Sequence, residues 1–267
     1  MEIRWHMLFD FAILLYLLAF LSAGFNAFLG GERYTKIATA FVSLAAVVNL
    51  SYLITRWYLF GAFPIKDLKD IFNMIILFLG VVAVYINYKV KKAGVYLFVI
   101  PVIIILGIAG FAHSSILIHK QFSSFWLAVH LPFTISGTVL FVVSALFGIL
   151  YFIQEKQLKK KNFGYLYNLL PSIDMLNKIN KTAMIVGFLL FTIGLLSGYI
   201  WGIYEWNGRI ILTSKLLFSM ITWFIFGIII VIKKTKGMSP RDTAFSSILG
   251  IVSVVVTYIG VALFIKG

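Results

Sequence analysis

Three of the four histidines, His113, His119 and His130, lie close together in the chain, and the fourth, His6, lies near the N-terminus. Neutral imidazole is the most common protein ligand of haem iron. His130 is the strongest candidate for this chemistry because Trp126 precedes it by four residues, so the two side chains project from one face of a helix. We therefore predict that His130 is an axial iron ligand, with His113 and His119 as further candidates.

A second group of residues has the types that would hold a flat apolar ligand. Trp201, Tyr204 and Trp206 form a short aromatic run, here called the aromatic shelf, and Arg209 and Lys215 follow it. Aromatic faces stack on a porphyrin ring, and cations bind its two propionates. We expect the aromatic shelf, Trp126, Arg209 and Lys215 to contribute to binding haem, the b-type group being the candidate.

Each of these residues also has a simpler interpretation. Tryptophan and tyrosine gather at bilayer interfaces without any ligand, and Lys215 could extend outward from a helix end to water. His113 and His119 could be ordinary loop residues. His130 is better supported, because an ionisable group that enters a membrane helix is costly and usually has a partner or a task.

The composition requires a membrane frame around these residues. Hydrophobic residues make up 61% of the 267, only 12% are charged, and the mean hydropathy is +1.01. Such a chain exceeds what a soluble domain can bury, and a helix needs about 20 apolar residues to span a bilayer. We predict an all-α polytopic bundle that forms a single domain over residues 1–267. Its eight expected helices cover approximately residues 7–29, 36–55, 71–88, 94–112, 125–153, 182–204, 213–232 and 243–265.

The distribution of lysine and arginine predicts the orientation of these helices. The connections after the first, third, fifth and seventh helices hold 15 of the 23 cations, and the other connections hold six. Positive charge is retained on the cytoplasmic side, so both termini should lie outside. The net charge of +14 is then explained by topology and attraction to anionic lipids, and nucleic-acid binding is not expected.

The longest hydrophilic connection, about residues 154–181, predicts no separate soluble domain. Its segment around Leu170, Ile173 and Leu176 is expected to be an amphipathic turn on the membrane surface. The absence of cysteine excludes thiolate sites, and we find no phosphate loop, zinc signature or catalytic triad, so no self-contained enzyme is predicted. A transporter is also disfavoured, because we see no pair of broken helices and no buried charge cluster.

From about Phe60 to the end, the chain resembles the cytochrome c assembly and haem-handling membrane proteins that include CcsA, CcmC and HemX. The segment Ser123-Ser-Phe-Trp-Leu-Ala-Val-His130 resembles the family's outer-histidine motif, and Trp201-Gly-Ile-Tyr-Glu-Trp206 its Trp-rich loop. The supporting matches are Phe63 to Asp70, Leu170 to Leu176, Gly187 to Gly198, and Lys215 with Ile221-Thr-Trp223.

This resemblance implies that haem is displayed at the outer face, with His130 as the first outer histidine and the aromatic shelf beneath the porphyrin. It also implies a prokaryotic-type cytoplasmic (inner) membrane, and as partners a membrane protein of cytochrome c assembly and apocytochrome c. The chain departs from the family at Ile211-Leu-Thr-Ser and at Ile230-Val-Ile-Lys233, and ends at Gly267 before a second outer histidine. We therefore expect it to resemble most the short HemX-like branch.

Two functions of different classes remain open at this point. The first is a haem-binding or haem-delivery component of c-type cytochrome biogenesis. The alternative is a membrane regulator or scaffold of tetrapyrrole synthesis or respiratory complex assembly, which would bind a partner through its lysine-rich connections without binding haem.

The orientation gives a direct test. A reporter that is active only in the cytoplasm, fused after Gly267, should be inactive because the charge distribution places this end outside. The same reporter inserted after Lys160 should be active. A strong signal from the Gly267 fusion would show that a helix has been miscounted.

Overall fold

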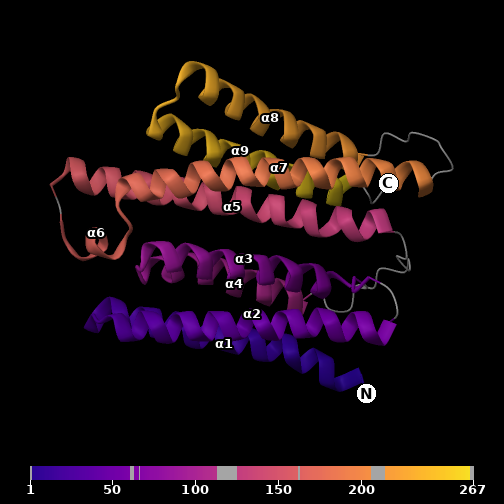
Figure 1. Ribbon diagram of the computed structural model, residues 1–267, viewed down its shortest axis with the longest axis horizontal. Coiled ribbons are helices and arrows are strands. Elements are labelled where there is room, and N and C mark those ends of the chain that lie inside the picture. Colours follow the sequence, from indigo (N-terminus) through magenta and orange to yellow (C-terminus); the bar gives the residue numbers. More distant parts are fainter. Residues whose placement is uncertain are drawn as a thin grey trace. The chain divides into compact units, whose positions relative to one another are not determined.

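The computed structural model describes residues 2–60, 63–65, 67–112, 125–161, 163–205 and 214–264, with the side chains of residues 2–6, 60, 214–215 and 256–264 excepted. Within these ranges the chain is all-α (Figure 1). The helices are α1 (Glu2–Leu29), α2 (Glu32–Phe60), α3 (Leu68–Val90), α4 (Gly94–Ala112), α5 (Phe125–Lys159), α6 (Tyr165–Leu169), α7 (Ile173–Glu205), α8 (Ser214–Lys236) and α9 (Pro240–Phe264).

Seven of the described helices, α1 to α5, α7 and α8, are long and apolar enough to cross a membrane. The all-α polytopic prediction is therefore confirmed. The eighth predicted span, 243–265, coincides with α9, whose side chains are described only as far as residue 255.

Several helices are longer than their predicted spans, because polar residues continue the helix beyond the apolar stretch. The largest differences surround the long connection, where α5 extends to Lys159 instead of residue 153 and α7 begins at Ile173 instead of residue 182. The predicted amphipathic turn is also corrected. Leu170 and Leu176 are 2% and 0% exposed, so they pack inside the protein and do not face lipid.

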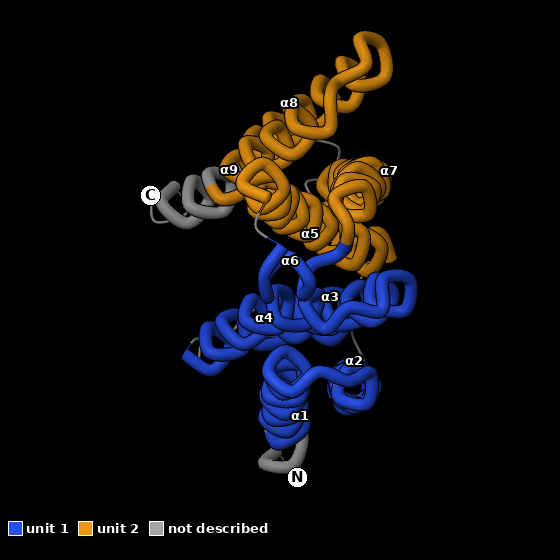
Figure 2. Tube along the Cα trace, turned by 90° about the vertical axis from the view of Figure 1, so that its left-hand side faces the viewer, with its two compact units in different colours: residues 1–123, 163–171 blue, residues 124–162, 172–267 orange. Residues whose placement is uncertain are grey.

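The chain divides into two compact units, coloured separately in Figure 2. Unit 1 contains residues 1–123 and 163–171, which include α1 to α4 and the short α6, and unit 2 contains residues 124–162 and 172–267. The single domain expected from the sequence stays a prediction.

In unit 1, α1 packs on α2 and α4, and α3 packs on α2 and α4, so the four helices form a closed bundle. A chain of buried polar side chains joins α1, α2 and α3. The Tyr16 hydroxyl accepts a hydrogen bond from Asn49 Nδ2 at 3.2 Å, and Asn73 Nδ2 donates to the Asn49 carbonyl at 3.1 Å. Gly80 leaves the space for Tyr16, because a Cβ there would lie 2.3 Å from the hydroxyl oxygen. Small residues and polar links of this kind hold helices together where lipid removes the hydrophobic driving force.

One end of unit 1 contains a buried ionic cluster formed by Tyr52, Arg56, Asp67 and Asp70. Arg56 is 2% exposed, and its guanidinium donates to Asp67 Oδ2 at 3.0 Å and also to Asp70. Tyr52 donates to Asp70 Oδ1 at 2.8 Å. The two aspartates form the capping box that begins α3, so the cluster fixes the start of α3 against α2. Burial, and then the charge of Asp70, raise the pKa of the Asp67 carboxyl.

This cluster corrects the statement that the sequence shows no buried charge cluster. Lys69 adds a further pair, because its ammonium lies 3.3 Å from Asp10 Oδ1 and 4.6 Å from the centre of the Phe9 ring. The sequence did not indicate the cluster, because Arg56 and both carboxylates were placed in the connection between the predicted spans 36–55 and 71–88, where charged side chains are expected to be exposed. Each cation in the cluster faces a carboxylate, so its clearest role is to connect α1, α2 and α3.

Unit 2 is centred on α5 and α7, with α8 and α9 beside them. Its apolar core contains Phe141, Met184, Phe191, Phe226 and Val254, and the rings of Phe141 and Phe226 are stacked with centroids 3.6 Å apart. A buried polar link also joins three helices.

That link is centred on Asn180 of α7. Its Nδ2 donates to the Ser144 carbonyl of α5 at 2.6 Å and to Ser247 Oγ of α9 at 2.7 Å, while Ser144 Oγ donates to the Asn180 carbonyl at 3.0 Å. All three residues are at most 1% exposed. Their mutual hydrogen bonds fix the register of the three helices.

Replacing Arg56 tests the ionic cluster. Arg56→Met should leave two buried carboxylates without their cation, which typically costs about 3 kcal/mol or more of unfolding free energy. The measurement is thermal unfolding of the full chain in detergent. The matched control is Lys36→Met, which removes the cation of the exposed Glu32–Lys36 pair and should change stability by less than about 1 kcal/mol. Equal unfolding temperatures for the two variants would contradict the assigned pairing.

Candidate functional site

His130 lies in the second turn of α5 and its imidazole contacts α7. Its Nδ1 is 2.7 Å from the carbonyl oxygen of Gly194, and Thr134 Oγ1 lies 3.2 Å from the same nitrogen. The side chain is partly buried. The helix continues through Pro132, so the ring is positioned by a regular helix and by the neighbouring backbone.

The Gly194 contact determines which nitrogen of the His130 ring carries hydrogen. A carbonyl oxygen only accepts hydrogen bonds, so the bond requires a hydrogen on Nδ1. In the neutral ring the lone pair is then on Nε2. A histidine that donates through one nitrogen to a backbone carbonyl and presents a lone pair on the other has the arrangement typical of metal-binding histidines.

Three glycines allow this contact because they let α5 and α7 approach closely. A Cβ at Gly194 would lie 2.7 Å from the Thr134 backbone nitrogen, and one at Gly198 would lie 2.4 Å from His130 Nδ1. On the α5 side, a Cβ at Gly137 would lie 2.6 Å from the Phe191 nitrogen. Any larger residue at these positions would separate the helices or displace the imidazole.

The aromatic candidates that the structure describes lie on the same two helices. Trp126 is one turn before His130 on α5 and makes an edge contact with Phe125, with centroids 5.7 Å apart. Trp201 and Tyr204 lie in the last turns of α7, where their spacing of three residues places them on one side of the helix. Trp201 is partly buried, and Tyr204 is 70% exposed.

Trp201 and Tyr204 lie within the predicted helix 182–204, although the motif that contains them was matched to a loop of the family. Residues 201 to 205 belong to α7, which ends at Glu205. Trp201 follows Gly198 by three residues, so it lies about one helical turn from the point where His130 contacts α7. The structure therefore brings His130, Gly194 and Gly198 together, with Trp126 and Trp201 one turn away on their helices.

The remaining candidates fall outside the described part of the structure. These are His113, His119, Trp206 and Arg209, together with the side chain of Lys215 at the start of α8. Their contribution to haem binding stays a prediction. Trp223, matched to the family by resemblance, is described, and it has a structural role. Its Nε1 donates to Thr192 Oγ1 at 2.8 Å and its ring stacks on Phe188, which joins α8 to α7.

Sequence reasoning missed the residues that position His130, namely Thr134, Gly194 and Gly198. A signal for the glycines was present. Gly187, Gly194 and Gly198 are separated by seven and four residues, so they lie on one face of a helix, and small residues at this spacing are typical of close helix contacts in membranes. Nothing in the sequence indicated that this face would meet His130.

Among the described residues, no three histidine, aspartate or glutamate side chains gather into a metal site. Haem iron does not require such a cluster, because the porphyrin supplies four nitrogens and the protein supplies axial ligands only. A single histidine of defined tautomer beside aromatic side chains is therefore compatible with haem.

Comparison with known families identifies the family of this chain. Residues 5–267 match the model of the family described as cytochrome c assembly protein. The chain belongs to this family. The match includes both units, so the resemblance seen from Phe60 onward extends over nearly the whole chain. Placement in the short HemX-like branch stays a prediction.

Individual relatives are distant but cover most of the chain. The cytochrome c biogenesis protein CcsA of Heterosigma akashiwo (strain NIES-293 / 8280G21-1) is 26% identical to this chain. The match covers 83% of this chain and 80% of that protein. CcsA of Pyropia yezoensis is 24% identical, and the match covers 100% of this chain and 97% of that protein. CcsA of Prochlorococcus marinus (strain NATL2A) is 24% identical over 284 residues, covering 95% and 90%.

The glycine contact can be tested by a matched pair of substitutions. Gly194→Ala should destabilise the protein by about 1–3 kcal/mol because its Cβ meets the backbone of Thr134. Gly227→Ala in α8 makes the same change in a helix, but its Cβ would lie 3.4 Å from the nearest atom, an ordinary contact, so stability should be unchanged or higher. Thermal unfolding in detergent measures both, and similar values would argue against the close approach of α5 and α7.

Proposed function

We propose that this protein binds haem at the outer face of the membrane and delivers it in c-type cytochrome biogenesis. The observation that carries the proposal is the 2.7 Å contact between His130 Nδ1 and the Gly194 carbonyl. With hydrogen on Nδ1, the lone pair of the neutral ring is on Nε2, the nitrogen that would bind iron in this proposal.

The same contact would strengthen that bond. A backbone carbonyl that accepts from Nδ1 increases the basicity of the opposite nitrogen and holds the ring in one orientation. Gly198 permits this orientation, because the imidazole occupies the space that a side chain at position 198 would fill. In this proposal the His130 side chain is pre-organised to bind iron, which reduces the entropy lost when haem binds.

The neighbouring aromatic residues support a planar ligand. Trp126 and Trp201 each lie about one turn from the His130 contact, on α5 and α7 respectively. Tyr204 continues the same side of α7 and is largely exposed, as expected for a surface that meets a ligand or the membrane interface. In this proposal Trp206, Arg209 and Lys215 complete the site, the two cations meeting the propionates.

Haem is the cargo of this process. The relatives named cytochrome c biogenesis protein CcsA supply the biological context: the cargo, haem b, would be passed to apocytochrome c with the help of a partner membrane protein. The predicted topology, with both termini outside a prokaryotic-type cytoplasmic membrane, places His130 near the outer surface. A second axial ligand would come from His113, His119 or the partner.

The experiment is the visible spectrum of the full chain purified in detergent after expression with ample haem. Wild type should carry a Soret band. His130→Ala should lose or shift this band, because a bond to iron is removed, and added imidazole should restore part of it. Gly198→Ala keeps the histidine but displaces its ring, so the band should shift or weaken.

The controls are His113→Ala and His119→Ala, which should change the spectrum less than His130→Ala does. Thermal unfolding of each variant separates loss of haem from loss of fold. Wild-type protein without a Soret band would contradict the proposal. A normal spectrum in His130→Ala, with loss in one of the control variants, would transfer the iron ligand to the connection between α4 and α5.

A further inference from the structure

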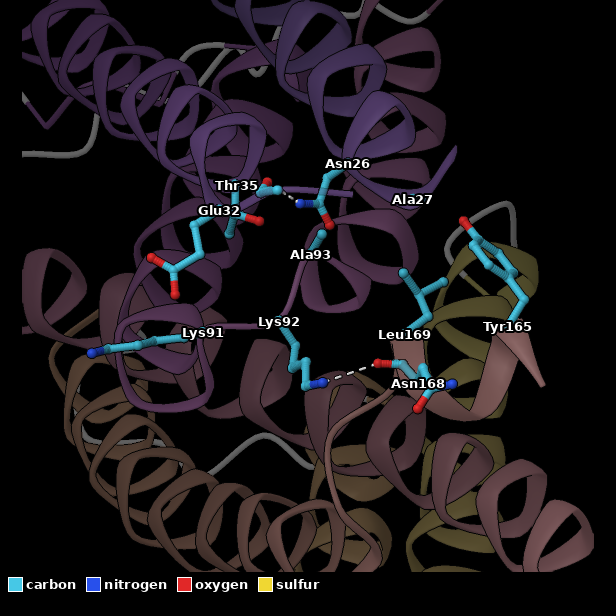
Figure 3. A pocket seen from close by; sticks show the side chains of 11 residues that line it. Asn26, Ala27, Glu32, Thr35, Lys91, Lys92, Ala93, Tyr165, Asn168 and Leu169 are labelled. Atoms are coloured by element: carbon cyan, nitrogen blue, oxygen red, sulfur yellow. Dashed lines mark hydrogen bonds between the residues drawn. The ribbon is translucent and has the colours of Figure 1, made fainter. Parts of the chain in front are cut away.

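Unit 1 contains a pocket that is separate from the proposed haem site and independent of that function. It has a volume of about 360 Å³, within the roughly 300–1,000 Å³ typical of small-ligand sites, and all its lining residues belong to unit 1. Figure 3 shows Glu32 and Lys91 on one side of it and Tyr165 and Asn168 on the other.

Three segments that are distant in the sequence form the walls of this pocket. They are the turn from α1 to α2, the turn from α3 to α4, and α6. The last two are connected directly, because Lys92 Nζ donates to the Asn168 carbonyl at 3.0 Å. Gly94 lets them approach, since a Cβ there would lie 2.4 Å from the Leu169 carbonyl oxygen. The pocket is therefore formed by defined contacts between its walls.

The charges lining the pocket favour an anion. Lys91 and Lys92 both line it, and they are opposed by one carboxylate, Glu32. That carboxylate already lies 3.9 Å from the ammonium of Lys36. The starts of α2 and α4 and the ends of α1 and α3 all lie at the pocket, so their opposite helix dipoles offset one another and the two lysines carry the positive charge. The side-chain amides of Asn26 and Asn168 already donate to backbone carbonyls, so they stabilise the walls of the pocket.

The backbone at Lys91 limits the residues that fit at this position, as it does at Lys161, which also has a positive φ. Lys91 is the C-cap of α3 and has φ 53° and ψ 40°, in the left-handed region where helices usually place glycine. A lysine is less stable than glycine in this conformation. The sequence nevertheless has lysine here and again at Lys92, both exposed at the pocket.

We propose that this pocket binds a phosphate-bearing anion. Lysine ammonium groups are a common means of binding phosphate. Two sources share this chemistry, the headgroup of an anionic phospholipid and a soluble phosphate ester. An exposed aromatic pair at the pocket favours the lipid, since Phe28 is 86% exposed and its ring stacks on Tyr165 with centroids 6.4 Å apart. Aromatic rings beside cations are typical of the membrane interface.

The test compares wild type with the double variant Lys91→Asn and Lys92→Gln. Asparagine tolerates the left-handed conformation at position 91, and glutamine at position 92 keeps an N–H group that can donate to the Asn168 carbonyl. The variant therefore removes two charges while keeping a donor for the contact between the walls. The matched control is Lys89→Gln with Lys160→Gln, which removes two exposed lysines that do not line the pocket. The full chain in detergent is titrated with phosphatidylglycerol or phosphatidylcholine, and bound lipid is counted by native mass spectrometry.

Wild type and the control should bind phosphatidylglycerol about tenfold more tightly than the pocket variant, and phosphatidylcholine should bind weakly to all three. A parallel arm adds inorganic phosphate or glycerol phosphate and follows thermal unfolding. Protection of wild type but not of the pocket variant in this arm would identify a soluble phosphate ester as the source. Equal binding by all three proteins, or equal loss in the control, would overturn the proposal, because general surface charge would then explain the affinity.

Discussion

The close approach of α5 and α7 is the constraint on which the proposed site depends. An imidazole can donate to the backbone carbonyl of a neighbouring helix only if the two helix axes are close, and Gly137, Gly194 and Gly198 remove the side chains that would keep them apart. The contact also satisfies Nδ1 in a region where an unpaired polar group is costly. The close packing of α5 and α7 therefore also orients the His130 imidazole.

Polar interactions inside apolar helices fix the register in both units. In unit 2, Asn180 links three helices through Ser144 and Ser247. In unit 1, Arg56 joins the end of α2 to the capping box of α3. Both links consist of groups that satisfy one another, and this matters because the membrane offers no water to replace a missing partner. They hold the frame while leaving the end of α7 and the turns of unit 1 accessible for binding.

The two proposed binding places differ in chemistry. His130 and the aromatic residues near it suit a flat apolar ligand with a metal, whereas Lys91 and Lys92 suit a compact anion. The pocket is formed partly by α6, which follows the end of α5, while His130 lies near the beginning of α5. The connection from α5 to α7, expected to lie on the membrane surface as a simple turn, therefore contributes a wall to the pocket.

The sequence by itself determined the membrane character and most helix positions, and it predicted His130 and its neighbouring tryptophans as a candidate site. Composition and hydropathy are local properties, and a long apolar stretch has few alternatives to a spanning helix. The helix ends were less predictable, because polar residues at the ends of α5 and α7 extend the helices without an apolar signal. The resemblance to the family could be found from motif order, because those motifs lie within single segments.

Only the tertiary structure decided which groups meet. The hydrogen bond from His130 to Gly194 joins residues 64 positions apart, and the glycine face of α7 gives no indication of its partner in the sequence. Arg56 reaches Asp67 and Asp70 only because α2 and α3 are antiparallel neighbours. The pocket exists only where two turns and α6, which are distant in the sequence, come together. These features depend on helix packing, which is fixed by the fit of many side chains at once and is not a property of any single segment.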